Sequence, residues 1–252
     1  MSNEKKSIHD LLEFIDNSPT PFHAVEEMKS KLIGQGYSAL KESDTWGLTS
    51  NGKYFITRND SSLIAFIIGT KTKDASGFKI IGAHTDSPNL KLKPNPAYEK
   101  NDYIQLGVEV YGGVLLTTWT DRDLSLAGRV IIKGKKEPQS KLVRFDEPLL
   151  RIPQLAIHLN RDVNEKGLTL NKQNHLPPLF SMVDKNGKNI FDGGNKWSKE
   201  SLFAVGGFEL LCPRVVLGRL LVVVGCWMLA VGIAGCRGGV RFLLVARLLG
   251  RC

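Results

Sequence analysis

The sequence predicts an α/β domain that is followed by a β-rich module. In the first part of the chain, two segments with helical periodicity precede short apolar strands, as expected for a sheet covered by helices. After Pro96, apolar residues alternate with polar ones and glycine-rich turns recur, which is typical of strands with one covered face. The predicted domains are therefore residues 1–96 and 97–205, and a tail of different composition occupies residues 206–252.

Two helices are expected near the N-terminus. Ser7 can cap the first, which ends before Pro19, and an apolar stripe with helical spacing lies between these two residues. The second helix begins at Thr20-Pro21, because proline is tolerated in a first turn, and ends at Gly34 or Gly36. The stripe of the first helix consists of Ile8, Leu11, Leu12 and Ile15.

Short apolar runs predict the strands of both domains. The runs at 63–68 and 78–83 are continuous, so both are expected to be buried on both faces of a sheet. The run at 104–110 alternates, which predicts a strand with one covered face. The remaining strands are expected at residues 54–57, 114–118, 128–132 and 142–145.

Charge and cysteine content restrict the class of protein. The net charge is +9, but residues 1–205 carry 28 Lys and Arg against 24 Asp and Glu, without a basic cluster interleaved with aromatic residues. A nucleic-acid partner is therefore not expected. Residues 1–205 contain no cysteine, which favours a protein of the reducing cytoplasm, and the N-terminus does not have the pattern of a signal peptide.

The composition changes at Gly206. Residues 206–252 contain six Arg, no Lys and Glu209 as their single carboxylate, together with all four cysteines. Residues 220–236 form an uncharged run of 17 residues, which is at the short end of what spans a bilayer. Two interpretations stay open: a genuine hydrophobic or membrane tail, or a stretch that a frameshift, fusion or assembly error joined to the ancestral protein.

A His-x-Asp pair follows the apolar run 80–83. His84 and Asp86 stand at the expected strand end, just before Pro88. Neutral imidazole is the commonest zinc ligand, and a ligating histidine usually needs a nearby carboxylate or carbonyl to fix its tautomer. The alternatives are a histidine satisfied by neighbouring groups at the strand end and an aspartate that begins a turn. One histidine cannot hold a metal ion by itself.

Five segments together resemble the aspartyl aminopeptidase family, cytosolic di-zinc exopeptidases of the eighteenth metallopeptidase family. The resemblance covers residues 1–205 and about the first half of a family member. The segments that carry it are Ser18-Pro-Thr-Pro-Phe-His23, Gly82-Ala-His-Thr-Asp-Ser-Pro-Asn-Leu-Lys-Leu-Lys-Pro94, Tyr111-Gly-Gly, Trp119-Thr-Asp-Arg-Asp-Leu-Ser-Leu-Ala-Gly-Arg129 and Ile152-Pro-Gln-Leu-Ala-Ile-His-Leu-Asn-Arg161.

The resemblance implies a fold, a cofactor and a reaction. Family members have an α/β zinc-peptidase domain interrupted by a β-rich dimerisation domain, and their dimers assemble into dodecamers. They use two zinc ions and metal-activated water to remove N-terminal residues, often acidic ones, from peptides. The resemblance thus implies peptide substrates, a homo-oligomer and a cytoplasmic location for this protein.

The resemblance also implies roles for individual residues. His84 matches a zinc ligand of the family, and Asp86 matches the carboxylate that orients this ligand. His158 lies in an apolar run that by itself predicts a packed strand residue, whereas the family's histidine at this place reaches across the dimer interface into the neighbouring active site. The segment 121–123 is expected to be a charged turn of the dimerisation module, and His9 a solvated residue of the first helix.

The sequence departs from the family after Val205. The other metal ligands of the family follow the dimerisation insert, and residues 206–252 contain no matching block. Because a di-zinc site needs several carboxylate or imidazole ligands, we expect a truncated chain that is inactive by itself. Two alternatives are a catalytically silent dimerisation or interaction fragment and a membrane-tethered remnant.

Overall fold

The computed structural model describes residues 3–70, 78–132, 137–183, 208–211 and 242–246. The chain divides into two compact units, each with its own sheet. The first comprises Met1–Ser87 together with Val216–Cys252, and the second comprises Pro88–Val215. The predicted division after Pro96 falls inside a strand of the second unit, Asn89–Lys100.

Both predicted N-terminal helices are present, but Ser7, the predicted cap of the first, lies inside that helix. Helix α1 spans Asn3–Asn17 and helix α2 spans Pro21–Gly34. Thr20 caps α2, since its hydroxyl oxygen accepts a hydrogen bond from the main-chain N–H of His23 at 3.4 Å. Gly36, just past the end of α2, has a φ of +79°, a conformation that glycine adopts without a steric penalty.

A five-stranded sheet forms the centre of the first unit. Its strand order is β1-β2-β3-β12-β4. Strands β2 and β3 form an antiparallel hairpin, whereas β12 lies antiparallel to β3 and parallel to β4. The bounds are Ser38–Ala39 for β1, Lys53–Arg58 for β2, Ser62–Ile67 for β3, Lys79–Ala83 for β4 and Phe242–Ala246 for β12.

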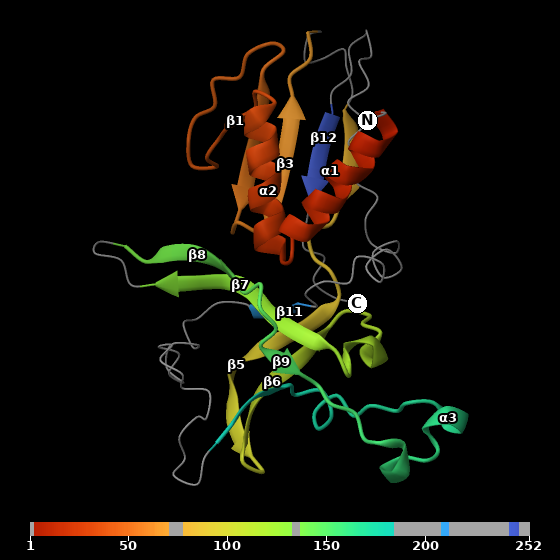
Figure 1. The fold of residues 1–252 in the computed structure, drawn as a ribbon. Helices are drawn as coiled ribbons and strands as arrows, with labels where there is room; N and C mark the ends of the chain where they lie inside the picture. The colour runs from red at the N-terminus through yellow and green to blue at the C-terminus, as the bar shows by residue number, and fades with distance from the viewer. Residues whose placement is uncertain (1–2, 71–77, 133–136, 184–207, 212–241, 247–252) are drawn as a thin grey trace. The chain divides into compact units, whose positions relative to one another are not determined.

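Helices α1 and α2 lie over one face of this sheet (Figure 1). Helix α2 contributes Val25 and Met28 to the core, and α1 contributes Phe14. The other apolar residues of α1 at 8, 11 and 12 are exposed. The helices meet Phe55, Leu63 and Ala65 of the hairpin, so helix–sheet packing builds this core.

The prediction that residues 78–83 are buried on both faces is wrong. Strand β4 forms there, but Ile80 and Ile81 are 61% and 42% exposed. Among the described residues, β12 is the only strand that pairs with β4. A continuous apolar run shows that a strand is compatible with burial on both faces. Whether its side chains are buried depends on the strands and helices that pack against it.

A seven-stranded sheet forms the second unit, with strand order β11-β5-β6-β10-β9-β7-β8 and a further pairing of β11 with β7. Because β11 pairs with both β5 and β7, the described strands close on themselves as in a small barrel. The bounds are Asn89–Lys100 for β5, Tyr103–Tyr111 for β6, Asp123–Ile132 for β7, Gln139–Arg144 for β8, Leu150–Arg151 for β9, Leu179–Met182 for β10 and Phe208–Leu211 for β11.

Alternation along β6 places one face of this strand in the core, as predicted for residues 104–110. Strand β7 covers the predicted residues 128–132, but its buried residues form a continuous stretch, 124–128, and do not alternate. The predicted strand at 142–145 corresponds to β8. The fully buried side chains of this core come from four strands and two loops. They include Leu90, Leu106, Leu124, Leu126, Ile152, Leu176 and Leu210.

Strand β11 lies within residues 206–252, the segment whose composition differs from that of residues 1–205. Phe208 and Leu210 are buried in the core, and Glu209 between them is also buried. Four residues of β11 pair with β7, from Phe208 opposite Gly128 to Leu211 opposite Ser125. The change of composition at Gly206 therefore does not coincide with the end of this sheet.

Three other predictions about secondary structure were wrong. The segment 114–118 forms a 3₁₀ turn, η1 (Leu116–Trp119), and the apolar run around His158 forms a second one, η2 (Ile157–Leu159), before the short helix α3 (Val163–Lys166). Strand β5 was not anticipated, because prolines at 94 and 96 interrupt its pattern. The β5–β6 register shifts between Leu92 and Ala97, which accommodates these prolines.

In the part of the chain that the structure describes, no helix is both long and apolar enough to cross a membrane. The apolar run 220–236 and the four cysteines lie outside the described residues.

Candidate functional site

The His-x-Asp pair lies directly after β4. His84 follows the last residue of the strand, and Thr85 and Asp86 are buried, with Asp86 8% exposed. The predicted position of the pair at a strand end is therefore confirmed. All three residues belong to the first unit.

The His84 ring is oriented by the main chain of Asp86. The Nδ1 atom of His84 lies 2.7 Å from the main-chain oxygen of Asp86 and 3.4 Å from the carboxylate Oδ1. A carbonyl oxygen can only accept, so Nδ1 must carry the proton in this hydrogen bond. The neutral ring then has its lone pair on Nε2, the atom with which many histidines bind metals.

This geometry makes His84 suitable as one zinc ligand. The expectation that the Asp86 carboxylate orients the ring is modified, because the carbonyl of the same residue is closer to Nδ1. The side chain of His84 is partly exposed, whereas that of Asp86 is almost buried. The described residues around His84 do not assemble three ligand side chains, so they do not complete a zinc site.

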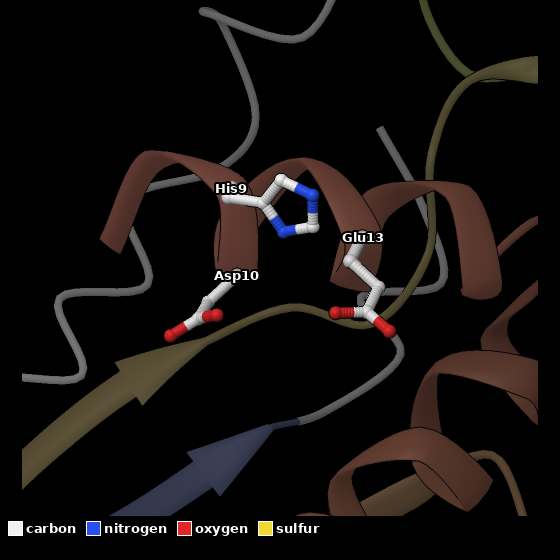
Figure 2. A group of neighbouring side chains, drawn as sticks. All are labelled: His9, Asp10 and Glu13. Carbon is white, nitrogen blue, oxygen red and sulfur yellow. The ribbon is translucent and has the colours of Figure 1, made fainter. Parts of the chain in front are cut away.

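Three potential ligand side chains do converge at another place in the described residues. His9, Asp10 and Glu13 lie on exposed positions of α1, with their ligand atoms within 4.8 Å of one another (Figure 2). The sequence predicted a solvated His9 and did not predict this group. Glu13 follows His9 by four residues and Asp10 by three, and both spacings bring side chains together on a helix. Exposed groups of this kind are common without a metal ion.

His158 lies on η2 in the second unit, where it is exposed together with its apolar neighbours. Leu155 and Leu159 are 65% and 74% exposed, and Ile157 is exposed as well. The expectation of a packed strand residue is thus wrong. Consecutive exposed apolar side chains are unusual on a free surface, and they favour a segment that contacts another molecule.

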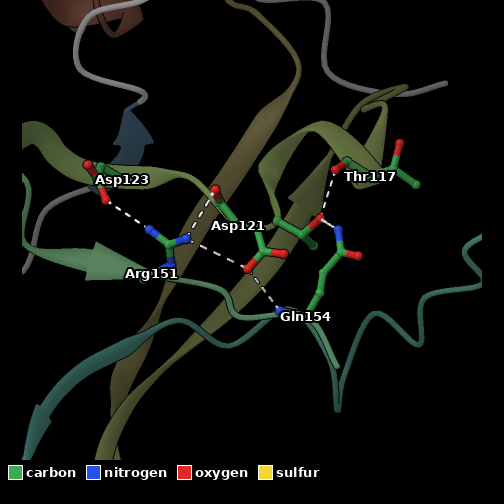
Figure 3. A network of polar contacts seen from close by, with 6 residues as sticks. Thr117, Asp121, Asp123, Arg151 and Gln154 are labelled. Atoms are coloured by element: carbon green, nitrogen blue, oxygen red, sulfur yellow. Dashed lines mark hydrogen bonds and ion pairs between the residues drawn. The ribbon is translucent and has the colours of Figure 1, made fainter. Parts of the chain in front are cut away.

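A polar network precedes this segment and connects it to the turn at 121–123 (Figure 3). Arg151 forms ion pairs with Asp123 at 3.2 Å and with Asp121 at 3.8 Å. Asp121 has a φ of +50°, and its carboxylate accepts a hydrogen bond from the main-chain N–H of Gln154 at 3.2 Å. The Gln154 side chain donates to the hydroxyl of Thr120. The charged turn is thereby confirmed.

The sequence pattern of one peptidase family matches most of the chain. The family described as "Aminopeptidase I zinc metalloprotease (M18)" matches residues 14–205. The chain belongs to the peptidase M18 family. This stretch of the M18 pattern contains His84, Asp86 and His158, and the family is one of zinc-dependent metallopeptidases.

Curated M18 relatives are similar over the same part of the chain. A protein of Clostridium acetobutylicum named "Probable M18 family aminopeptidase 2" is 49% identical over 187 residues, which cover 73% of this chain and 43% of the relative. A Pseudomonas aeruginosa protein of the same name is 50% identical over 173 residues, 69% of this chain and 40% of the relative. The chain therefore spans less than half the length of these relatives.

Solved M18 structures share the fold. Chaetomium thermophilum mApe1 aligns with a TM-score of 0.75 and 30% identity over 94% of this chain and 61% of its own. The S. cerevisiae mApe1 dodecamer aligns with a TM-score of 0.56 and 27% identity, over 72% of this chain and 49% of its own. The predicted family is thus confirmed by both sequence and structure.

Proposed function

We propose that this protein takes part in the zinc-dependent removal of N-terminal residues from peptides. The observation that carries this proposal is the match of residues 14–205 to the zinc metalloprotease family. The orientation of His84 supports it, because the hydrogen bond from Nδ1 to Asp86 places the lone pair of the neutral ring on Nε2, the atom with which many histidines bind metals. Zinc, when bound, supplies the Lewis-acid chemistry that activates water and polarises a scissile carbonyl.

Each predicted site residue has a role in this proposal. His84 holds zinc through Nε2, and Asp86 fixes the ring through its main-chain carbonyl with its carboxylate nearby. His158 contacts the substrate in a neighbouring subunit, and the exposure of Leu155, Ile157 and Leu159 around it supports an intersubunit position. A homo-oligomer follows from this arrangement, as in the dodecameric mApe1.

The proposal extends to substrate, location and metal content. We propose peptides with an acidic N-terminal residue as substrates, two zinc ions in the complete site, and the reducing cytoplasm as the location. The absence of cysteine from residues 1–205 supports that location. Residues 206–252 offer one carboxylate, Glu209, which is already paired with Lys91, so the printed chain by itself should not hold both ions or turn over peptides.

The test uses a chimera with the Clostridium acetobutylicum relative. Residues 1–205 of this chain replace the matching part of the relative, and zinc content and hydrolysis of aspartyl and leucyl peptides are measured. We expect zinc-dependent hydrolysis with preference for the aspartyl peptide. His84→Ala should abolish hydrolysis and lower zinc content, whereas His175→Ala, at an exposed loop residue, should leave both unchanged.

Zinc content and peptide hydrolysis are measured in parallel for the unmodified 252-residue chain. Stoichiometric binding of two zinc ions and peptide hydrolysis by this chain alone would contradict the expectation of an incomplete site. A folded chimera without hydrolysis, or one that His84→Ala leaves fully active, would contradict the proposed function of residues 1–205.

A further inference from the structure

The backbone between His84 and Asp86 is anchored by the residue that separates them. The Thr85 hydroxyl donates a hydrogen bond of 2.7 Å to the main-chain oxygen of Ser61. Thr85 is 3% exposed and Ser61 is also buried, so this hydrogen bond is shielded from water. The two residues are 24 positions apart, and both belong to the first unit.

The acceptor lies on a tightly constrained hairpin loop. Residues 59–61 connect β2 and β3, whose last pair is Arg58 opposite Ser62. Asn59 and Asp60 have φ values of +53° and +52°, which these residue types tolerate better than most. The main-chain N–H of Ser61 donates to the oxygen of Arg58 at 3.2 Å, and this fixes the loop further.

We propose that Thr85 is a positioning residue for the His84 imidazole. The hydrogen bond from Nδ1 of His84 forms only when the carbonyl oxygen of Asp86 lies within reach of the ring. The position of this oxygen depends on the main chain of Thr85, which connects the two residues. The Thr85 side chain ties this main chain to the β2–β3 loop and so holds the carbonyl in reach of the ring. In the neutral imidazole, this carbonyl keeps the proton on Nδ1 and the lone pair on Nε2.

The functional significance of this inference rests on the proposed function, because the position of the lone pair on Nε2 has a consequence for activity only if His84 binds a metal ion. It does not rest on zinc for its test. The position of the proton on an imidazole is read from the ¹⁵N chemical shifts of the two ring nitrogens, and this measurement needs no metal ion. Failure of the zinc proposal therefore stays distinguishable from failure of the positioning proposal.

The experiment compares three variants of this 252-residue chain with the unchanged protein at about pH 8.5, where an unperturbed imidazole is neutral. Thr85→Val keeps the shape of the side chain but removes the donor, and Thr85→Ser keeps the donor. Ser62→Ala is the matched control, because the Ser62 hydroxyl donates to the Arg58 oxygen in the same loop but is more exposed.

We expect the Nδ1–H tautomer of His84 in the unchanged protein, in Thr85→Ser and in Ser62→Ala. In Thr85→Val the ratio of Nδ1–H to Nε2–H should fall about fivefold, the effect of losing one net hydrogen bond. A Thr85→Val protein with an unchanged ratio would overturn the proposal. So would an Nε2–H tautomer in the unchanged protein, or a Thr85→Ser protein that loses the Nδ1–H form, and these two results do not require Thr85→Val to fold.

Discussion

The ammonium of Lys91 lies 3.3 Å from the carboxylate of Glu209, whose side chain is 5% exposed. The pair joins β5 to β11, and the Asn89 amide donates a second hydrogen bond to the same carboxylate. Lys91 also lies over the ring of Tyr111, 3.7 Å from its centroid. A charge this deeply buried needs its partners, because desolvation of an unpaired carboxylate opposes folding.

Replacement of Lys91 should therefore destabilise the second unit. Lys91→Met keeps most of the apolar stem but removes the ammonium that lies beside Glu209, so we expect the free energy of unfolding to fall by about 3 kcal/mol. Lys93→Met is the control on the same strand, since Lys93 contacts Gln173 at an exposed site, and its expected loss is below about 1 kcal/mol. Urea unfolding measures the free energy of unfolding of both variants. Equal losses would show that the buried Lys91–Glu209 pair contributes no more to stability than an exposed lysine contact.

Gly112 should not tolerate a side chain. It has a φ of +69°, and an added Cβ would lie 3.3 Å from Cβ and Cγ of Pro88. Gly112→Ala is expected to lower the free energy of unfolding by about 1–3 kcal/mol, through backbone strain and this tight contact.

The neighbouring glycine provides the control. A Cβ at Gly113 would meet no atom within 4 Å, and no positive φ is found there. Gly113→Ala should change stability by less than about 1 kcal/mol, and the gain or loss is read from thermal unfolding of the two proteins side by side. A Gly112→Ala protein as stable as Gly113→Ala would contradict the importance of the close approach to Pro88.

Asp121 has a left-handed backbone conformation, and its carboxylate accepts a hydrogen bond from the main-chain N–H of Gln154. Asp121→Asn keeps a residue type that tolerates a φ of +50° and also keeps Oδ1 as acceptor for the Gln154 N–H. Asp121→Ala removes both advantages, so we expect it to be about 1–2 kcal/mol less stable than Asp121→Asn. The exposed ion pairs with Arg151 contribute little to this difference.

The comparison of these two variants by guanidinium unfolding separates the roles. Similar stability of Asp121→Ala and Asp121→Asn would mean that neither the hydrogen bond nor the backbone conformation matters. A large and equal loss in both variants relative to the unchanged protein would instead assign the stability to the charge of Asp121 and its pairing with Arg151.

His158 should affect catalysis but not metal binding. In the chimera described above, His158→Ala is expected to lower kcat about 100-fold, the typical effect of removing one donor to a developing oxyanion, and to leave zinc content unchanged. His175→Ala again serves as the control at an exposed histidine. Unchanged turnover in His158→Ala would remove this residue from the proposed mechanism, and loss of zinc would make it a metal ligand instead.

Local pattern and composition predicted much of the first unit. The helix that begins at Thr20-Pro21 and the hairpin strands depend on neighbouring residues, and they appear where the sequence places them. The strand-end position of His84 was predictable for the same reason. The group on α1 at His9 could have been found from its spacing, whereas the exposed η2 turn could not, because its apolar residues resemble those of a strand.

By itself, the sequence determined the family, the two N-terminal helices, half of the described strands and the position of the His-x-Asp pair, because these depend on residue order over short distances. Only the tertiary structure decided that the Asp86 carbonyl orients His84, that Thr85 is tied to Ser61, and that β11 belongs to the sheet of the second unit. These relationships join groups whose approach depends on the folded backbone. Long-range pairing and burial arise from the whole fold, and composition could not reveal that Glu209 lies buried beside Lys91.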